Sequence, residues 1–371
     1  MKNLRVSIFI PIYKESEMLE SLLESLSSED YEPKEIIVVV DEPTEKTKSL
    51  AKKVKNVRFI FNGHRLGKVN ALNEAVRSSK GEILLFLDGD VKIEKNGEGF
   101  LKTLVKEMED ADLVEIKKKV FRENFLTRVI YYDYLSSNVV SWLFSRGLKR
   151  SLGLNGSAFA IKRSVFEDLG GFRRVIAEDL DLATRSFLKN FRFKYSEKLE
   201  VFVKTPSKWR QVYKQRKRWG VGGALWIKEY YKDLIRNALR FPKFLLPTIP
   251  IIFPSLILFL LYTLIPDAII YKSIMVFILV AAIKIGFLLH PFFLSVVTIT
   301  LVKNLIASLL SFGAFASLFY IFARKLGYTF NPFEFLVFYF IFSPFWFSIV
   351  IASIIKVTIQ KGKVEVLDWK C

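Results

Sequence analysis

The chain has 371 residues, of which 51% are hydrophobic, and its 56 Lys and Arg against 37 Asp and Glu give a formal net charge of +19. A single cysteine, Cys371, excludes an intrachain disulfide framework and any cysteine-based metal site. The positive charge suits phosphorylated substrates and anionic lipid headgroups, and the apolar C-terminal half argues against nucleic acid as a partner.

The first 96 residues alternate between continuous apolar runs and amphipathic segments. Strands are expected at 5–13, 34–42, 57–62 and 81–90, and helices at 15–26, 44–54 and 67–79. The first apolar run is short and is followed by KESEMLE without small cleavage-site residues, so it is interpreted as a strand and not as a signal peptide. Repeated β-α units with fully apolar strands predict an α/β fold with a mostly parallel sheet covered on both faces.

Residues 97–240 are also expected to be structured, in a less regular order. Helices are expected at 97–109, 125–148, 177–190 and 207–226, a strand at 111–120, a strand and a helix ending in Gly-Gly at 153–172, and a β-hairpin at 191–206. The helix at 207–226 carries the basic and aromatic stretch KQRKRWGVGGALW.

Carboxylates follow two of the expected strands, where ligands bind in parallel sheets. Asp41 ends the second strand, and Asp88-Gly89-Asp90 ends the fourth. Two carboxylates on a short turn suit Mg²⁺ or Mn²⁺ that also holds a diphosphate. A solvated turn of ordinary composition is the alternative.

Two helix starts carry groups that suit catalysis or anion binding. Gly67-Lys68 opens a helix whose free N–H groups and lysine could meet a phosphate, or it is an ordinary helix start. Glu178-Asp179 opens another helix, and a carboxylate there could act as a general base toward a hydroxyl. The helix dipole alone also favours acids at this position and explains Asp181 equally well.

The basic stretch allows two interpretations. Gln215 and Arg218 share a helix face with Trp219 beside it, so Arg218 could hold phosphate oxygens while Trp219 offers a flat face to a sugar. A basic amphipathic helix lying on anionic lipid is the alternative.

Taken together and in this order, IPIYKE, Asp41, GKVNALN, DGD, ED and QRKRW resemble membrane-bound enzymes of glycosyltransferase family 2. The resemblance spans residues 5 to 226 and is strongest to the branch of cellulose, chitin and hyaluronan synthases and ceramide glucosyltransferase. It implies a GT-A, Rossmann-like nucleotide-sugar domain at 1–205, a basic interfacial region at 206–240 and a membrane domain at 241–371.

The resemblance also implies roles for individual residues. The base and ribose pocket would be lined by Pro11, Tyr13, Glu15 and Asp41. The nucleotide and its diphosphate would be contacted by Lys68, Asp88, Gln215 and Arg218. A Mg or Mn ion would be held by Asp90 with Asp88. Asp179, beside Glu178, would deprotonate the acceptor hydroxyl, and Trp219 would form the floor under the acceptor.

The sequence departs from the family pattern at three places, which weakens any inference about the sugar. Ala177 replaces the usual threonine before Glu-Asp, Lys14 replaces an asparagine, and the second strand ends in DEPT. The expected activity is an inverting, metal-dependent transfer from a nucleotide sugar, UDP being favoured, to a membrane lipid or glycolipid. A processive polysaccharide synthase is the alternative. A non-enzymatic scaffold or transporter should have lost the carboxylates, which are present.

The C-terminal part is expected to cross the membrane. Apolar segments at 244–265, 268–290, 293–323 and 333–358 predict four spans, with three as an alternative, and the prolines of the first should kink or interrupt it. The basic tail at 356–363 and the basic region before Phe241 favour a multi-pass protein of the cell membrane with a cytosolic catalytic domain. The protein is also a possible homo-oligomer. Lys303 lies inside a span, either as a functional charge or as a snorkelling residue.

Overall fold

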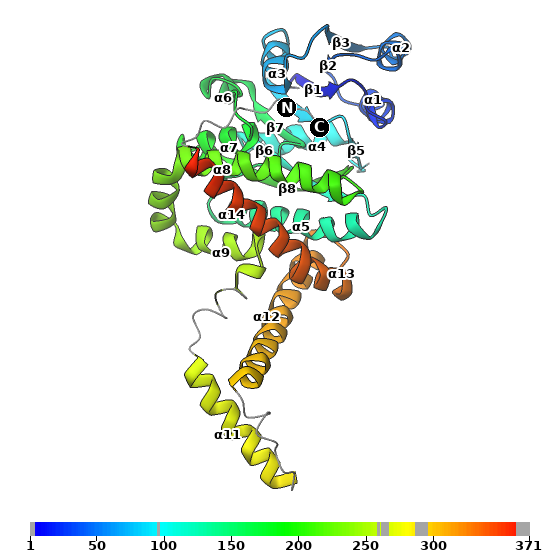
Figure 1. Cartoon of the computed structure of the whole chain (residues 1–371). Helices are drawn as coiled ribbons and strands as arrows, with labels where there is room; N and C mark the ends of the chain where they lie inside the picture. Colours follow the sequence, from blue (N-terminus) through cyan, green and yellow to red (C-terminus); the bar gives the residue numbers. More distant parts are fainter. Residues whose placement is uncertain (1–3, 95–96, 258–259, 261–266, 286–295, 361–371) are drawn as a thin grey trace. The chain divides into compact units, whose positions relative to one another are not determined.

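The computed structural model describes residues 4–94, 97–257, 260, 267–285 and 296–360 (Figure 1). The chain divides into two compact units: Met1–Thr248 with Ser348–Cys371, and Ile249–Phe347. The first unit contains an eight-stranded sheet and the second contains helices.

The sheet has the order β3-β2-β1-β4-β7-β6-β8-β5. Its strands are β1 Val6–Tyr13, β2 Lys34–Asp41, β3 Val57–Asn62, β4 Ile83–Leu87, β5 Val91–Ile93, β6 Leu113–Val120, β7 Ala158–Lys162 and β8 Phe193–Val203. The first four strands in sequence are parallel neighbours, as expected. The sheet as a whole is mixed, which corrects the mostly parallel prediction: β7 is antiparallel to β4 and to β6, and β5 is antiparallel to β8.

The helices of the first unit pack by apolar faces, as their sequence periods require. They are α1 Leu19–Ser27, α2 Glu45–Lys53, α3 Lys68–Arg77, α4 Phe100–Glu109, α5 Phe125–Gly147, α6 Arg163–Asp168, α7 Glu178–Leu188 and α8 Trp209–Arg240. In α1 the buried residues are Leu19, Leu22, Leu23 and Leu26, one face of a helix. Helix α5 starts with a capping box between Asn124 and Thr127, and it packs on β6 and β8.

The predicted hairpin at 191–206 is wrong, because this segment forms one strand, β8, with a bulge. Pairing to β6 is parallel before and after the bulge but shifts from Ile116↔Ser196 to Lys117↔Glu200. The extra residues end in Leu199, which is fully buried and whose amide donates to the Ser196 hydroxyl at 2.9 Å. Burial of that leucine keeps the polar stretch in the sheet where sequence composition suggested a turn.

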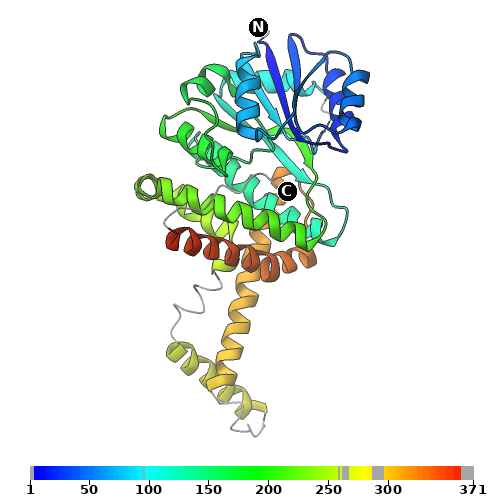
Figure 2. The same ribbon diagram turned by 45° about the horizontal axis from the view of Figure 1, so that its top comes forward.

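Helix α8 extends beyond the expected residue 226 to Arg240, and two glycines in its middle allow close packing. A Cβ on Gly220 would lie 2.6 Å from the Ser353 hydroxyl oxygen of α14 (Ser343–Ile359), and one on Gly222 would lie 3.0 Å from Ile176. Both views show the red segment of α14 lying along the green α8 (Figure 2). The glycines of GVGG thus allow close helix contacts here.

The second unit holds most of the apolar C-terminal sequence. Its helices include α11 Asp267–Ile285, α12 Val296–Leu326, α13 Pro332–Val337 and the π-helical turn η2 Phe338–Phe342. Among the described residues, Thr300–Leu326 and Pro332–Ile359 are long and apolar enough to cross a membrane, judged by length and composition. They overlap the expected spans 293–323 and 333–358.

The other two expected spans fall partly outside the described residues, which omit 258–259 and 261–265 of the first. Helix α9 (Pro242–Ile252) stops before Pro254, so the expected interruption of 244–265 by proline is confirmed. Residues 286–290 of the span at 268–290 lie outside the described residues. The arrangement of four spans therefore stays a prediction. Lys303 is buried within the second unit.

Candidate active site

A small cavity opens where β1 and β4 end at their carboxyl side. Its lining includes the charged side chains of Lys68, Asp88, Glu178 and Asp179 together with Pro11 and Gly156. Its apolar floor includes Phe86, Phe159 and Phe172. The floor is rigid because Phe86 stacks on Phe159 at a centroid distance of 5.0 Å and contacts Phe172 edge-on at 5.1 Å. Five predicted site residues from four separate segments therefore meet in one cavity.

Lys68, the first residue of α3, is the cation of this cavity. Its Nζ donates to Asp88 Oδ1 at 2.8 Å and lies 3.6 Å from Glu178 Oε1. Burial alone would lower the pKa of Lys68, but the charges of Asp88 and Glu178 raise it above its ordinary value. The lysine therefore stays protonated and can meet an anion.

Asp88-Gly89-Asp90 form a tight turn after β4. A Cβ on Gly89 would lie 2.9 Å from Ile12 Cγ1, and the Gly89 carbonyl accepts a hydrogen bond of 2.5 Å from Ser16, so the turn needs glycine. Partial removal from water and the charge of Asp88 raise the pKa of the Asp90 carboxyl to about 7, although Asp90 borders solvent.

The Asp88–Asp90 turn fits a divalent cation that also binds a substrate. Two carboxylates that repel each other favour a cation between them, and Mg²⁺ or Mn²⁺ commonly takes one or two carboxylates and completes its shell with phosphate oxygens. No group of three or more His, Cys, Asp or Glu suited to a metal occurs among the described residues.

The strand ends on the other side of β1 are linked to one another. Tyr13, Asp41 and Asn62 are in register across β1, β2 and β3. Asp41 accepts from Asn62 Nδ2 at 2.7 Å and from the Gly67 amide at 2.8 Å. The carboxylate therefore fixes the loop that leads to Lys68, a role that the sequence did not reveal.

Tyr13 and Glu15 follow at the end of β1, outside the cavity lining. The Tyr13 hydroxyl donates to Glu42 Oε2 at 2.9 Å, and Glu15 Oε2 accepts from the Thr44 hydroxyl at 3.0 Å. Tyr13 is partly exposed, which leaves its ring at the surface beside the cavity.

The two acids at the start of α7 have different surroundings. Asp179 Oδ2 accepts from the Gly156 amide at 2.9 Å, and a Cβ on Gly156 would collide with this carboxylate at 2.9 Å. Glu178 is buried, and burial raises its pKa to about 7 against the opposing charge of Lys68. Asp179 is the more accessible of the two carboxylates. Gly156, which the sequence analysis did not single out, positions it.

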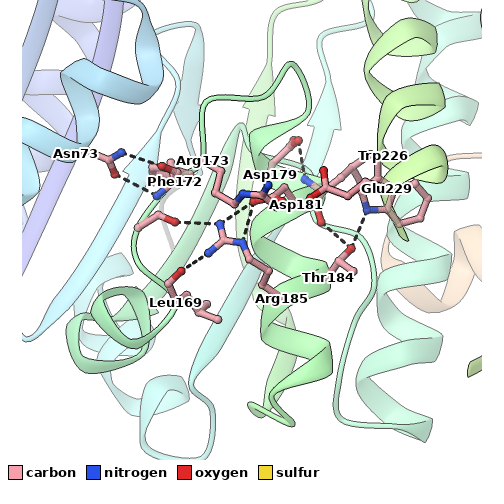
Figure 3. A network of polar contacts seen from close by, with 12 residues as sticks. Asn73, Leu169, Phe172, Arg173, Asp179, Asp181, Thr184, Arg185, Trp226 and Glu229 are labelled. Atoms are coloured by element: carbon pink, nitrogen blue, oxygen red, sulfur yellow. Dashed lines mark hydrogen bonds and ion pairs between the residues drawn. The ribbon is translucent and has the colours of Figure 1, made fainter. Parts of the chain in front are cut away.

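Asp181 is the centre of a buried hydrogen-bond network (Figure 3). In the sequence, the helix dipole alone was enough to explain an acid at this position. It accepts from Arg185 Nε at 2.8 Å, Arg173 at 3.0 Å and the Tyr230 hydroxyl of α8 at 2.7 Å. A second link joins the same helices, since Trp226 Nε1 donates to the Thr184 hydroxyl at 2.8 Å. These bonds fix α8 against the helix that starts with Glu178 and Asp179.

Asn73 connects this network to α3, the helix that carries Lys68. Its side chain donates to the Phe172 carbonyl at 2.9 Å and accepts from the Phe172 amide at 3.1 Å (Figure 3). In the turn before Phe172, Gly170 and Gly171 both have positive φ. This backbone shape suits the prediction that the preceding helix ends at Gly-Gly.

Gln215, Arg218 and Trp219 lie half-buried on α8 and are absent from the cavity lining. Close contact of Gly222 with Ile176 and Ala177 brings the next turn of α8 to the residue that precedes Glu178.

Arg216, to which no role was assigned, is 1% exposed and its NH2 lies 2.8 Å from Asp133 Oδ2 of α5. Its guanidinium also lies 4.5 Å from the Trp219 ring centroid, which is a cation–π contact that restrains the ring. The sequence places four cations within residues 214–218 and does not indicate which of their side chains is buried.

Comparisons with known proteins identify relatives of this chain. Residues 7–170 match the glycosyl transferase family 2 profile. The chain is 24% identical over 247 residues to the poly-β-1,6-N-acetyl-D-glucosamine synthase of Staphylococcus aureus, covering 65% of this chain and 60% of that protein. It is 25% identical over 223 residues to the synthase of the same name from Staphylococcus epidermidis, covering 59% and 54% of the two chains.

A mannosyltransferase from Pyrobaculum calidifontis, solved in complex with GDP-Man and Mn²⁺, has a similar fold. Its TM-score is 0.51 at 20% identity, and the alignment covers 82% of this chain and 87% of the other. The chain therefore has a GT-A-like sheet, and its residues 7–170 match the glycosyl transferase family 2 model. It is homologous to a polysaccharide synthase, of which it matches 60% of the length.

Proposed function

We propose that this glycosyltransferase moves a sugar from a nucleoside diphosphate sugar to a hydroxyl acceptor at the cytosolic face of a membrane, with inversion at the anomeric carbon. The observation that carries the proposal is the cavity in which Lys68 and Asp88 meet Asp179. A cation, a strand-end acid and an accessible carboxylate are the groups that such a transfer needs.

The donor binds with its diphosphate beside Lys68 and the Asp88–Asp90 turn. Lys68 offers a buried positive charge, and Arg218 with Gln215 binds the phosphate oxygens from α8. A divalent cation held by Asp90 and Asp88 would supply positive charge to the leaving diphosphate. The base is held near Tyr13, and UDP is the favoured nucleotide by the resemblance of the QRKRW motif.

The reaction is one displacement. The acceptor oxygen attacks the anomeric carbon, a new C–O bond forms, and the bond to the β-phosphate oxygen breaks. The nucleoside diphosphate leaves with the electron pair of that bond. Asp179 accepts the proton of the acceptor hydroxyl. Glu178 lies beside the ammonium group of Lys68, and Trp219 stacks against the acceptor sugar.

The acceptor is a membrane lipid or glycolipid, as the apolar C-terminal helices and the basic face of α8 suggest. A growing polysaccharide is the second candidate, and one observation favours it: the similarity of 247 residues to poly-β-1,6-N-acetyl-D-glucosamine synthase. In that case the chain would extend a polymer and help to translocate it.

Incubation of the purified full-length protein with lipid extract, Mn²⁺ or Mg²⁺ and radiolabelled nucleotide sugars tests the proposal. Label in an organic-soluble product identifies a lipid acceptor. Label in a large, glycosidase-sensitive product identifies a polymer. No transfer from any nucleotide sugar, with either metal, contradicts the proposal.

A further inference from the structure

We propose that Arg65 recognises the base of the nucleotide donor and makes the enzyme prefer uracil or guanine to adenine. The inference rests on the proposed function and concerns the donor end of the same site. Arg65 lies between β3 and α3, three residues before the cavity-lining Lys68 that was assigned to the diphosphate.

The loop that carries Arg65 is fixed at both ends by one carboxylate. Asp41 accepts from Asn62 Nδ2 before the loop and from the Gly67 amide after it. Gly67 has a φ of 80°, so the loop also has a backbone shape that favours glycine. Arg65 is therefore presented by a short, restrained loop.

The guanidinium of Arg65 lies against an aromatic ring, and two of its nitrogens lack hydrogen-bond acceptors among the described residues. Its Cζ lies 4.5 Å from the Tyr13 ring centroid. Its NH1 and NH2 are shielded from solvent and have no hydrogen-bond partner among the residues that the structure describes. Shielded donors without acceptors are unfavourable, and a ligand that offers acceptors relieves them.

The order of strands indicates which part of the donor meets Arg65. Asp88 follows β4 on one side of β1, whereas Asp41 and the Arg65 loop follow β2 and β3 on the other side. A donor whose diphosphate lies at Lys68 and Asp88 and whose base extends toward β2 and β3 brings that base to Tyr13 and Arg65. Pro11 and Tyr13 are two apart on β1, so their side chains leave the same face of the sheet.

The chemistry of the guanidinium then selects the base. Arginine only donates, and uracil and guanine offer carbonyl oxygens, with N7 beside O6 in guanine. Adenine places an amino group, another donor, where guanine has its carbonyl. Arg65 therefore favours UDP or GDP over ADP.

Binding of UDP, GDP, ADP and uridine to the full-length protein, measured by calorimetry, tests this assignment. The wild type should bind UDP or GDP about tenfold more tightly than ADP, and Arg65→Ala should weaken the preferred nucleotide about tenfold with little change for ADP. If UDP is preferred, Arg65→Ala should weaken uridine by the same factor. Arg65→Lys keeps the charge but loses the planar fork and should also lose the preference.

Arg58→Ala is the matched control, since Arg58 lies on β3 and donates to the Ser78 carbonyl and hydroxyl at the surface. It should bind every nucleotide as the wild type does. The assignment is overturned if Arg65→Ala leaves all affinities unchanged. It is also overturned if UDP, GDP and ADP weaken equally, which would place Arg65 on the phosphates. If the wild type binds no nucleotide, the proposed function itself fails.

Discussion

Lys68, the first residue of α3, donates a 2.8 Å hydrogen bond to Asp88, the first residue after β4. The pair joins the start of a helix to the end of a strand, and Glu178 lies on the other side of the ammonium group at 3.6 Å. One lysine thus balances acids from two elements in a poorly solvated cavity, where losing one partner of a charge pair is costly. The donor diphosphate is expected to use the same charge.

Lys68→Met should raise the apparent KM for the donor and lower the rate by about tenfold or more, because it removes the cation and leaves two acids facing each other. Initial rates and nucleotide affinity measured on the same preparation check this. Lys48→Met is the control, since Lys48 forms an exposed pair with Glu45 on α2. Equal donor affinity in Lys68→Met and wild type would remove Lys68 from the donor site.

Gly222→Val should impair transfer while Gly223→Val should not. A Cβ on Gly222 would lie 3.0 Å from Ile176 and 3.3 Å from Ala177, whereas nothing lies within 4 Å of one on Gly223. The larger side chain at 222 would push α8, which carries Trp219, away from the start of α7, which carries Asp179. Rates of sugar transfer and of donor hydrolysis, compared for both variants, measure this. Similar transfer rates in the two variants would argue against close α7–α8 contact in catalysis.

Removal of divalent metal should stop turnover, because Asp88 and Asp90 supply carboxylates but no complete metal shell without the donor phosphates. Activity should fall below detection in excess EDTA and return when Mn²⁺ or Mg²⁺ is added beyond the chelator. Asp90→Asn should lower the activity regained at saturating metal by about tenfold or more. Unchanged rates in excess chelator would mean that the turn serves another purpose.

Asp112 should stabilise the catalytic domain in a pH-dependent way. Burial alone would raise its pKa, but hydrogen bonds from Arg192 and the charge of Lys162 lower the pKa of Asp112 to about 2. The stabilisation is fully present above the unfolded value near pH 4 and is lost as pH falls toward 2, because protonation breaks the pairs. Because Arg192 is half exposed, solvent screens part of this interaction, and Asp112→Asn should lower the free energy of unfolding by about 1 kcal/mol at pH 7.

Unfolding measured between pH 7 and pH 2 for wild type and Asp112→Asn should show the two curves converge in acid. Asp233→Asn is the control, because Asp233 pairs with Arg236 three residues away on the surface of α8 and should contribute little. A constant difference between wild type and Asp112→Asn at every pH would assign the loss to packing instead of charge.

The sequence predicted the parallel half of the sheet because that half follows from local pattern. Five of the twelve predicted site residues line the cavity. Strand-end acids such as Asp88 are recognisable from the apolar run before them, and Lys68 from the helix that starts at it. The bulge in β8 was missed because burial of Leu199 is a tertiary effect that local composition does not carry. The antiparallel β7 was missed for the same reason, since pairing partners are set by the whole sheet.

Contacts made across the chain also escaped prediction. Three roles depend on residues 21 to 83 positions away: Asp41 as a loop anchor, Gly156 as the donor to Asp179, and Arg216 as the buried partner of Asp133. Asp181 has the helix-start position that the dipole explains, but its hydrogen bond to Tyr230 spans 49 residues. Such pairs become visible only when the elements are assembled.

Asp179 is the base on which the proposed reaction depends, and the activity of Asp179→Asn tests this role directly. The variant keeps the size of the side chain and an oxygen for the Gly156 amide but cannot take the acceptor proton. Sugar transfer should fall by a factor of about 100 or more, while the affinity for UDP or GDP, measured by calorimetry on the same sample, should change less than about threefold. Transfer at the wild-type rate with intact nucleotide binding would contradict the assignment.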